Sequence, residues 1–185
     1  MYRIDIVPIG SLLLVLYIIS DFFKHKKSKL LKRIVRYSFI FYLLYVVQVT
    51  TGGINIPPLR EYRGISYQLV PFKFLQDWVE MYNRGGTDWF FLNSVKLSLY
   101  NLVMLLPLGI YFPVLFHIKS FKKVVLYTML TSLTIEIYQL IFSYYGLVLL
   151  RTANIDDIIL NTVGGIIGYF IYRIVLSKWI HRFIA

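Results

Sequence analysis

The chain has 185 residues, of which 58% are hydrophobic and 18% are aromatic. Soluble domains are about 45–50% apolar, so this composition indicates a chain surrounded largely by lipid. The formal net charge is +11, but the basic residues lie mainly in short segments between apolar runs. That distribution is typical of membrane topology and anionic headgroups, and it argues against nucleic-acid binding.

The sequence contains no cysteine, which excludes disulfides, thiolate catalysis and Cys-ligated metals. Its three histidines have no metal-ligand spacing to one another. We therefore expect neither a metal nor a cofactor.

The first apolar run predicts a membrane span over residues 4–20, and the second predicts a span over residues 34–49. A dense basic cluster between residues 24 and 36 joins them. Such clusters favour the cytoplasmic side of a membrane. The sequences Thr51-Gly52-Gly53 and Pro57-Pro58 end the second span, because Gly and Pro break helices.

Residues 52–96 form a long connection of lower basic density. Within it, apolar residues recur at helical spacing opposite polar ones: Phe72, Leu75, Trp78, Val79 and Tyr82. This pattern predicts an amphipathic helix lying in the membrane interface. Trp89, Phe90 and Phe91 are expected to form a further aromatic belt.

Three more spans are predicted over residues 97–116, 124–142 and 157–176. Pro107 and Gly109 near the middle of the third span predict a kink. The fold class is therefore an all-α integral membrane protein with about five transmembrane helices and an outer interfacial helix. We expect three regions: two N-terminal spans (1–50), the connection (51–96) and a three-helix core (97–185).

Placing the basic segments in the cytoplasm gives one consistent topology. The N-terminus and the segments 52–96 and 144–156 lie outside, whereas the segments 24–36 and 117–123 and the C-terminus lie inside. The expected location is the plasma membrane, with membrane lipids as partners. The sequence does not define an oligomeric state.

Polar residues inside the spans are the candidate site, because ionisable groups in a membrane are costly and usually functional. With this topology the polar residues of the last three spans lie together in the outer half of the bilayer. Arg151 is then near enough to pair with the carboxylates. The candidate ligand-binding residues are Asn101, Glu136, Gln139, Arg151, Asp156, Asp157 and Asn161.

Packing is the alternative interpretation of several of these residues. Gly164-x-x-x-Gly168 favours close helix contact, and Asp156 or Asp157 would equally serve to cap the fifth helix. Glu136 with Gln139 favours a functional group instead, since a buried carboxylate needs a partner.

Residues 67–172 resemble the VanZ-like family of small bacterial membrane proteins. The matching residues are Leu69-Val70-Pro71-Phe72, Asn101-x-x-x-Leu105-x-Pro107-x-Gly109, Glu136-x-x-Gln139 and Arg151-x-x-Asn154-x-x-Asp157-x-x-x-Asn161-x-x-Gly164-x-x-x-Gly168. Leu105 replaces the usual Phe, Asn154 the common Asp and Leu150 the usual Gly. The resemblance implies a role at the bacterial cell envelope and reduced susceptibility to teicoplanin-type glycopeptides.

Three functions fit the candidate site. The first is a pocket for a lipid, a lipid-linked wall precursor or a lipoglycopeptide. The second is an intramembrane enzyme with Glu136 or Asp157 as acid or base, although no motif names a reaction. The third is a small transporter or lipid flippase, but the polar stripe does not continue inward past Thr128.

Overall fold

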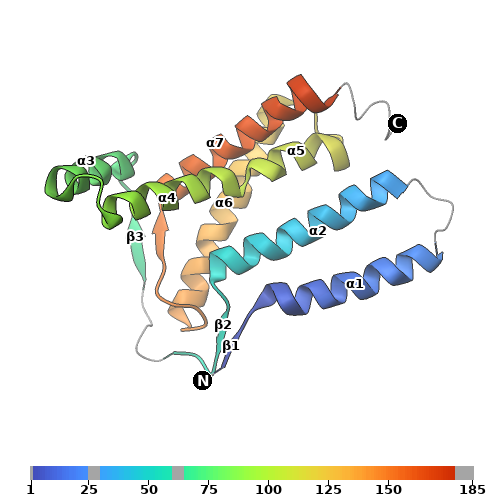
Figure 1. The fold of residues 1–185 in the computed structure, drawn as a ribbon, viewed down its shortest axis with the longest axis horizontal. Coiled ribbons are helices and arrows are strands. Elements are labelled where there is room, and N and C mark those ends of the chain that lie inside the picture. The colour runs from blue at the N-terminus through green and yellow to red at the C-terminus, as the bar shows by residue number, and fades with distance from the viewer. Residues whose placement is uncertain (1, 25–29, 60–64, 178–185) are drawn as a thin grey trace. The chain divides into compact units, whose positions relative to one another are not determined.

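The computed structural model describes residues 2–24, 30–59 and 65–177. The described chain is all-α in class, and five of its helices are long and apolar enough to cross a membrane, which confirms the predicted fold class (Figure 1). Lys26, Lys27 and Lys29 of the predicted cytoplasmic loop lie outside the described residues.

Contacts divide the chain into two compact parts. The hairpin part comprises the residues up to 65, residues 138–151 and those from 175 onward. The core part comprises residues 66–137 and 152–174.

In the hairpin part, two helices pack side by side: α1 (Ile6–Lys24) and α2 (Leu30–Thr51) (Figure 1). Strand β1 (Tyr2–Ile4) pairs antiparallel with β2 (Ile54–Ile56), which follows α2. The start of the chain therefore lies at the end of the hairpin where α2 finishes. Helix α2 begins four residues before the predicted Ile34, so Arg33 belongs to the helix and not to the loop.

In the core part, α7 (Ile155–Ile171) packs against α4 (Trp89–Met104) and α5 (Leu106–Leu115), and a π-helical turn, η1 (Tyr172–Leu176), follows it. The break between α4 and α5 falls at Leu105, just before Pro107, as the predicted kink requires. The helices approach closely, since a methyl group added at Gly164 would lie 1.8 Å from the Leu102 carbonyl oxygen. Glycine on α7 is therefore what permits this contact.

Helix α6 (Phe121–Tyr144) is continuous and supplies residues to both parts. It is slightly longer than the span predicted over 124–142. Its first turn is closed by a hydrogen bond from the Val124 amide to the Ser120 carbonyl, 3.0 Å long.

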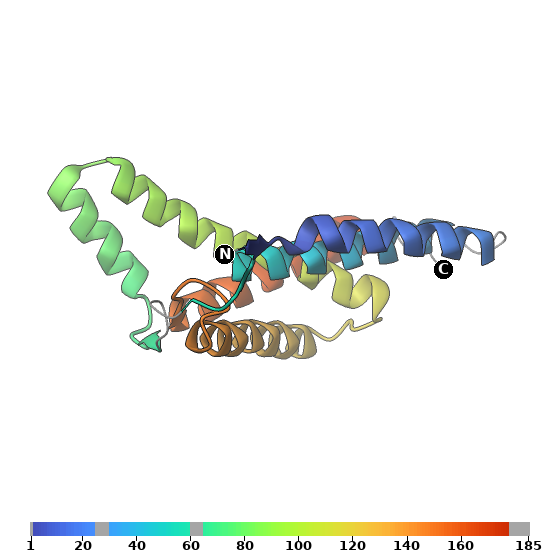
Figure 2. The same ribbon diagram turned by 90° about the horizontal axis from the view of Figure 1, so that it is seen from below.

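The helix predicted to lie in the membrane interface is α3 (Lys73–Gly85), which packs on α4. Figure 2 shows the two helices as arms that meet at the turn before Trp89. Helix α4 begins at Trp89, not near Leu97 as predicted, because the Asp88 side chain caps it by accepting a 2.9 Å hydrogen bond from the Phe91 amide. The aromatic residues assigned to a loop belt thus form the first turn of a span.

Sequence reasoning did not predict the short strands. Besides the β1–β2 pair, β3 (Ser66–Gln68) pairs in parallel with β4 (Thr152–Asn154). This second pair joins the segment before α3 to the segment before α7. It thereby brings the motif that begins at Leu69 close to the motif residues that begin at Asn154.

Candidate functional site

Asp156 carries a buried carboxylate, and the residue is only 1% exposed. Its oxygens accept hydrogen bonds from the amides of Phe72 (2.5 Å) and Phe74 (3.0 Å) and from Nε2 of Gln68 (3.2 Å). These donors lie at the start of α3, where backbone N–H groups have no partner within the helix. Asp156 therefore anchors the interfacial helix to the start of α7.

Asn154 caps the N-terminus of α7. The sequence alone suggests Asp156 or Asp157 as the capping residue. Its side chain accepts a 2.9 Å hydrogen bond from the Asp156 amide. Its own amide donates 2.9 Å to Oε2 of Glu136, a residue that is 4% exposed on α6. The buried carboxylate thus binds the backbone at the point where the chain re-enters a span.

A polar track continues along α6 from Glu136. Ser132 and Thr128 are fully buried, and Nδ2 of Asn161 donates to Oγ of Ser132 at 2.9 Å. Oδ1 of Asn161 and Oγ1 of Thr128 are buried and have no hydrogen-bond partner among the described residues. Buried polar atoms usually have partners, so this track has unused capacity to bind a polar atom.

Two other candidates of the core part lie half-buried. Asn101 is on α4, and Asp157 is in the first turn of α7. Hydrogen bonds link Glu136, Asn154 and Asp156 in series, and Asn161 bonds Ser132, which lies one turn before Glu136 on α6. The position of Asn101 in a shared pocket stays a prediction.

Gln139 and Arg151 belong to the hairpin part. Nε2 of Gln139 donates 2.7 Å to the Thr50 carbonyl, and the Tyr138 hydroxyl hydrogen-bonds Thr50 Oγ1. The Arg151 amide donates 3.2 Å to Oγ of the buried Ser143. The predicted pairing of Arg151 with Glu136 or Asp157 stays a prediction, because the two parts have no determined relative position.

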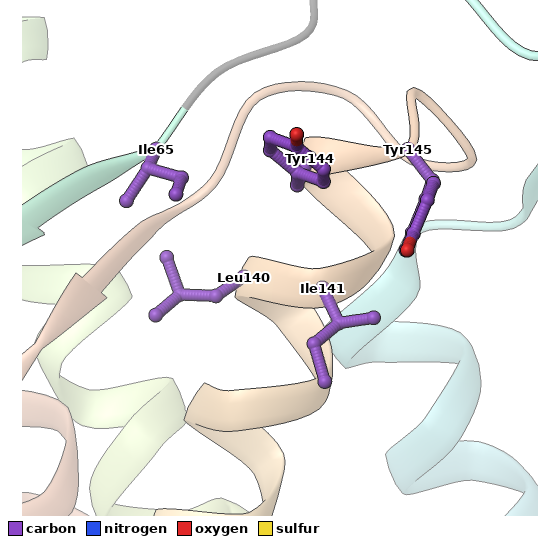
Figure 3. A pocket seen from close by; sticks show the side chains of 5 residues that line it. All are labelled: Ile65, Leu140, Ile141, Tyr144 and Tyr145. Atoms are coloured by element: carbon purple, nitrogen blue, oxygen red, sulfur yellow. The ribbon is translucent and has the colours of Figure 1, made fainter.

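An apolar groove lies at the end of α6, with a volume of about 350 Å³. Leu140, Ile141, Tyr144 and Tyr145 line it together with Ile65, which precedes β3 (Figure 3). The rings of Tyr144 and Tyr145 meet edge to face at 5.3 Å. Tyrosines at the end of a span suit the membrane–water interface, so the groove is suited to an apolar chain beneath a polar headgroup.

A buried ion pair in the hairpin part escaped sequence reasoning. Nε of Arg33 lies 2.7 Å from Oδ2 of Asp21, and the Tyr37 hydroxyl also bonds this carboxylate. The available signal was Asp21 at the end of the first span facing Arg33 and Tyr37, which are spaced one helical turn apart. In the sequence, Arg33 is part of the basic cluster, which predicts only the side of the membrane on which it lies.

The polar face of α3 carries an exposed ion pair, in which Nζ of Lys73 lies 2.9 Å from Oδ1 of Asp77. The hydrogen bond and the charge of Asp77 raise the pKa of Lys73 above its usual value. Leu75, Val79 and Tyr82 are exposed on the same helix. Charge on one side and exposed apolar residues on the other are typical of a helix lying on a membrane.

These features define a multi-pass membrane protein whose buried carboxylates bind the chain where it enters its spans. The family model described as VanZ/LLP1 matches residues 39–176, which is most of the chain. The chain belongs to this family. Comparison with curated proteins and with solved structures gave no match.

Proposed function

We propose that the protein acts at the bacterial plasma membrane, where it binds an amphipathic lipid-linked ligand on the extracytoplasmic side and lowers susceptibility to teicoplanin-type glycopeptides. The candidate ligands are a lipid, a lipid-linked wall precursor and a lipoglycopeptide. Family membership supports the phenotype, and the basic segments support an outside location for β1, β2 and the segment after α6.

The observation that carries this proposal is Glu136, a carboxylate that is 4% exposed within a candidate membrane span. Carboxylates in spans are costly, and Oε2 of this one accepts a hydrogen bond from the Asn154 amide. The neighbouring Asn161 adds an unused buried acceptor atom. Together they offer polar contacts within a span to a ligand headgroup.

The test is deletion of the gene in its host, followed by complementation with the intact gene or with a Glu136→Gln variant. We expect deletion to increase susceptibility to teicoplanin more than to vancomycin, which lacks an acyl tail. The physical reason is insertion of the tail beside the protein, where each buried methylene contributes about 0.8 kcal/mol. The intact gene should restore tolerance and the Glu136→Gln variant should not, although its protein accumulates normally.

Thr134→Val is the matched control for complementation, because Thr134 lies on α6 but is exposed and bonds only the Leu130 carbonyl. It should complement fully. Equal shifts for both drugs would point to a change in wall-precursor supply and contradict the lipid-tail argument. No shift for either drug would overturn the antibiotic role.

A further inference from the structure

Two arginines of the hairpin part converge on one glycine. A methyl group added at Gly52 would lie 3.3 Å from Nη2 of Arg3 and 3.4 Å from Nη2 of Arg151, with no other described neighbour within 4 Å. These two nitrogens are therefore at most 6.7 Å apart, the sum of those distances. Gly52 has a φ of 67° and no side chain, so the space between the two guanidinium groups stays open.

Backbone contacts hold both arginines in place. Arg3 lies on β1 opposite Asn55 of β2, and the amide of Arg151 is bound by Ser143 at the end of α6. Neither anchor uses a guanidinium group. The two cationic groups are thus brought together by the fold while their donors remain available.

The local charges do not balance within the hairpin part. A carboxylate of the hairpin part near Arg3 is Asp5, whose Oδ1 accepts a 2.8 Å hydrogen bond from Nε2 of Gln48. Asp5 Oδ1 lies at most 5.8 Å from Nε of Arg3, because a methyl group on Gly53 would be 3.0 Å from the first atom and 2.8 Å from the second. Among the described residues of the hairpin part, neither arginine makes an ion pair within 4.0 Å.

Arg151 also carries an unused buried donor. Its Nε is inaccessible to solvent and has no hydrogen-bond partner in the described chain. An unsatisfied donor on a charged group is costly, and two like charges this close repel each other. Both costs are removed by an anion that accepts hydrogen bonds from the two side chains.

We propose that Arg3 and Arg151 bind the phosphate group of an anionic lipid or lipid-linked precursor. The planar fork of arginine matches phosphate oxygens in a bidentate way. Basic pockets at the ends of spans bind lipid headgroups, and this pair lies where α1 begins and α2 ends. The assignment rests on the proposed function and adds to it the chemistry of the headgroup.

The groove at the end of α6 supplies room for the acyl chain. Leu140, Ile141, Tyr144 and Tyr145 occupy the same last turns of the helix as Ser143, which holds Arg151. A phosphate bound by the arginines and a tail in the groove together describe an amphipathic ligand.

The experiment is native mass spectrometry of the full chain released from detergent micelles. The probes are phosphatidylglycerol, diacylglycerol with the same acyl chains and inorganic phosphate. We expect retention of phosphatidylglycerol, little retention of diacylglycerol and weaker binding of inorganic phosphate. Arg151→Gln and Arg3→Gln should each weaken phosphatidylglycerol binding about tenfold or more, since hydrogen bonds to charged groups are lost.

Arg84→Gln is the matched control. It removes the same charge, but Arg84 is exposed on α3, where its Nη2 lies 3.4 Å from Oε2 of Glu80. It should leave retention unchanged, and Arg151→Lys, which keeps the charge without the fork, should be intermediate. Helicity and melting temperature show whether each variant is folded. If Arg151→Gln unfolds, Arg3→Gln carries the test, because strand β1 is held through its backbone.

Several outcomes would overturn the assignment. Equal losses for Arg151→Gln and Arg84→Gln would show a non-specific charge effect. Equal retention of diacylglycerol would leave only the apolar groove, and binding of inorganic phosphate without phosphatidylglycerol would assign the site to the free ion. Lost lipid binding with unchanged teicoplanin susceptibility would contradict the proposed function alone, whereas the reverse result would contradict only the phosphate site.

Discussion

The amide of Asn154 donates a 2.9 Å hydrogen bond to Oε2 of Glu136. This bond joins strand β4, which directly precedes α7, to a carboxylate of α6 within a candidate span. Glu136 therefore has a structural contact that can be separated from ligand binding, since glutamine keeps a carbonyl oxygen and leucine does not.

We predict that Glu136→Gln keeps the melting temperature close to that of the unchanged protein, whereas Glu136→Leu lowers stability. Leucine leaves the part-buried Asn154 amide without its acceptor on Glu136, and an unsatisfied donor costs up to about 1–3 kcal/mol. Thermal unfolding in detergent, followed by tryptophan fluorescence, measures the difference. A Glu136→Leu protein as stable and as active as the unchanged chain would show that the carboxylate is neither an anchor nor a site.

Asp156 should control the order of the interfacial helix. Asp156→Ala removes the acceptor of the Phe72 and Phe74 amides, so we expect both amides to exchange hydrogen much faster. Hydrogen exchange read by mass spectrometry over the first turns of α3 measures this effect. Asp77→Asn is the control on the same helix. Asp77 is partly exposed, and its side chain forms an ion pair with Lys73 rather than a bond to the Phe72 or Phe74 amide.

Protection of the Phe72 and Phe74 amides that survives Asp156→Ala would contradict the anchor. The control should leave these amides protected while it returns the pKa of Lys73 towards its usual value, since the Asp77 charge and hydrogen bond raise it. That pKa change is measurable by titration of the lysine side chain and reports that the control altered its intended contact.

Hydropathy and motif order predicted the spans because both are local properties of the sequence. The five candidate spans follow from apolar length, and the exposed apolar residues of α3 follow from helical period. Contacts of the polar residues could not be predicted in the same way. Asp156 binds the amide of a residue 84 positions away, a pairing that depends on the parallel β3–β4 contact and has no local signal.

The missed Arg3 and Arg33 illustrate the same limit. Arg33 belongs to a basic cluster that predicts topology, and Arg3 is the basic residue before the first span. The structure gives Arg33 a buried carboxylate partner and brings Arg3 close to Arg151. The distribution of Lys and Arg among the loops predicts on which side of a membrane such residues lie. It contains no information about which of them face each other.

Close packing of α7 on α4 should make Gly164 intolerant of any side chain. A methyl group there would lie 1.8 Å from the Leu102 carbonyl oxygen, which is backbone and cannot rotate away. We expect Gly164→Ala to destabilise the protein by about 1–3 kcal/mol, as overpacking does. Thermal unfolding in detergent measures it.

Gly10→Ala is the matched control for this substitution. It also adds a methyl group within a membrane helix, but the three atoms nearest to that group all belong to the flexible side chain of Leu44. Its effect on the melting temperature should be clearly smaller. Equal effects of the two substitutions would show that the α4–α7 contact is not as close as the structure describes.

Orientation in the membrane is the last prediction, and the absence of cysteine makes it directly measurable. Single cysteines at Thr87 and Thr152, both exposed, should react with a membrane-impermeant thiol reagent in intact cells, whereas one at Ser120 should not. The reason is the excess of Lys and Arg around Ser120, which favours the cytoplasm. Permeabilised cells provide the control, because all three positions should then react. Labelling of Ser120 with protection of Thr152 would invert the topology and place Arg3 and Arg151 against the inner leaflet.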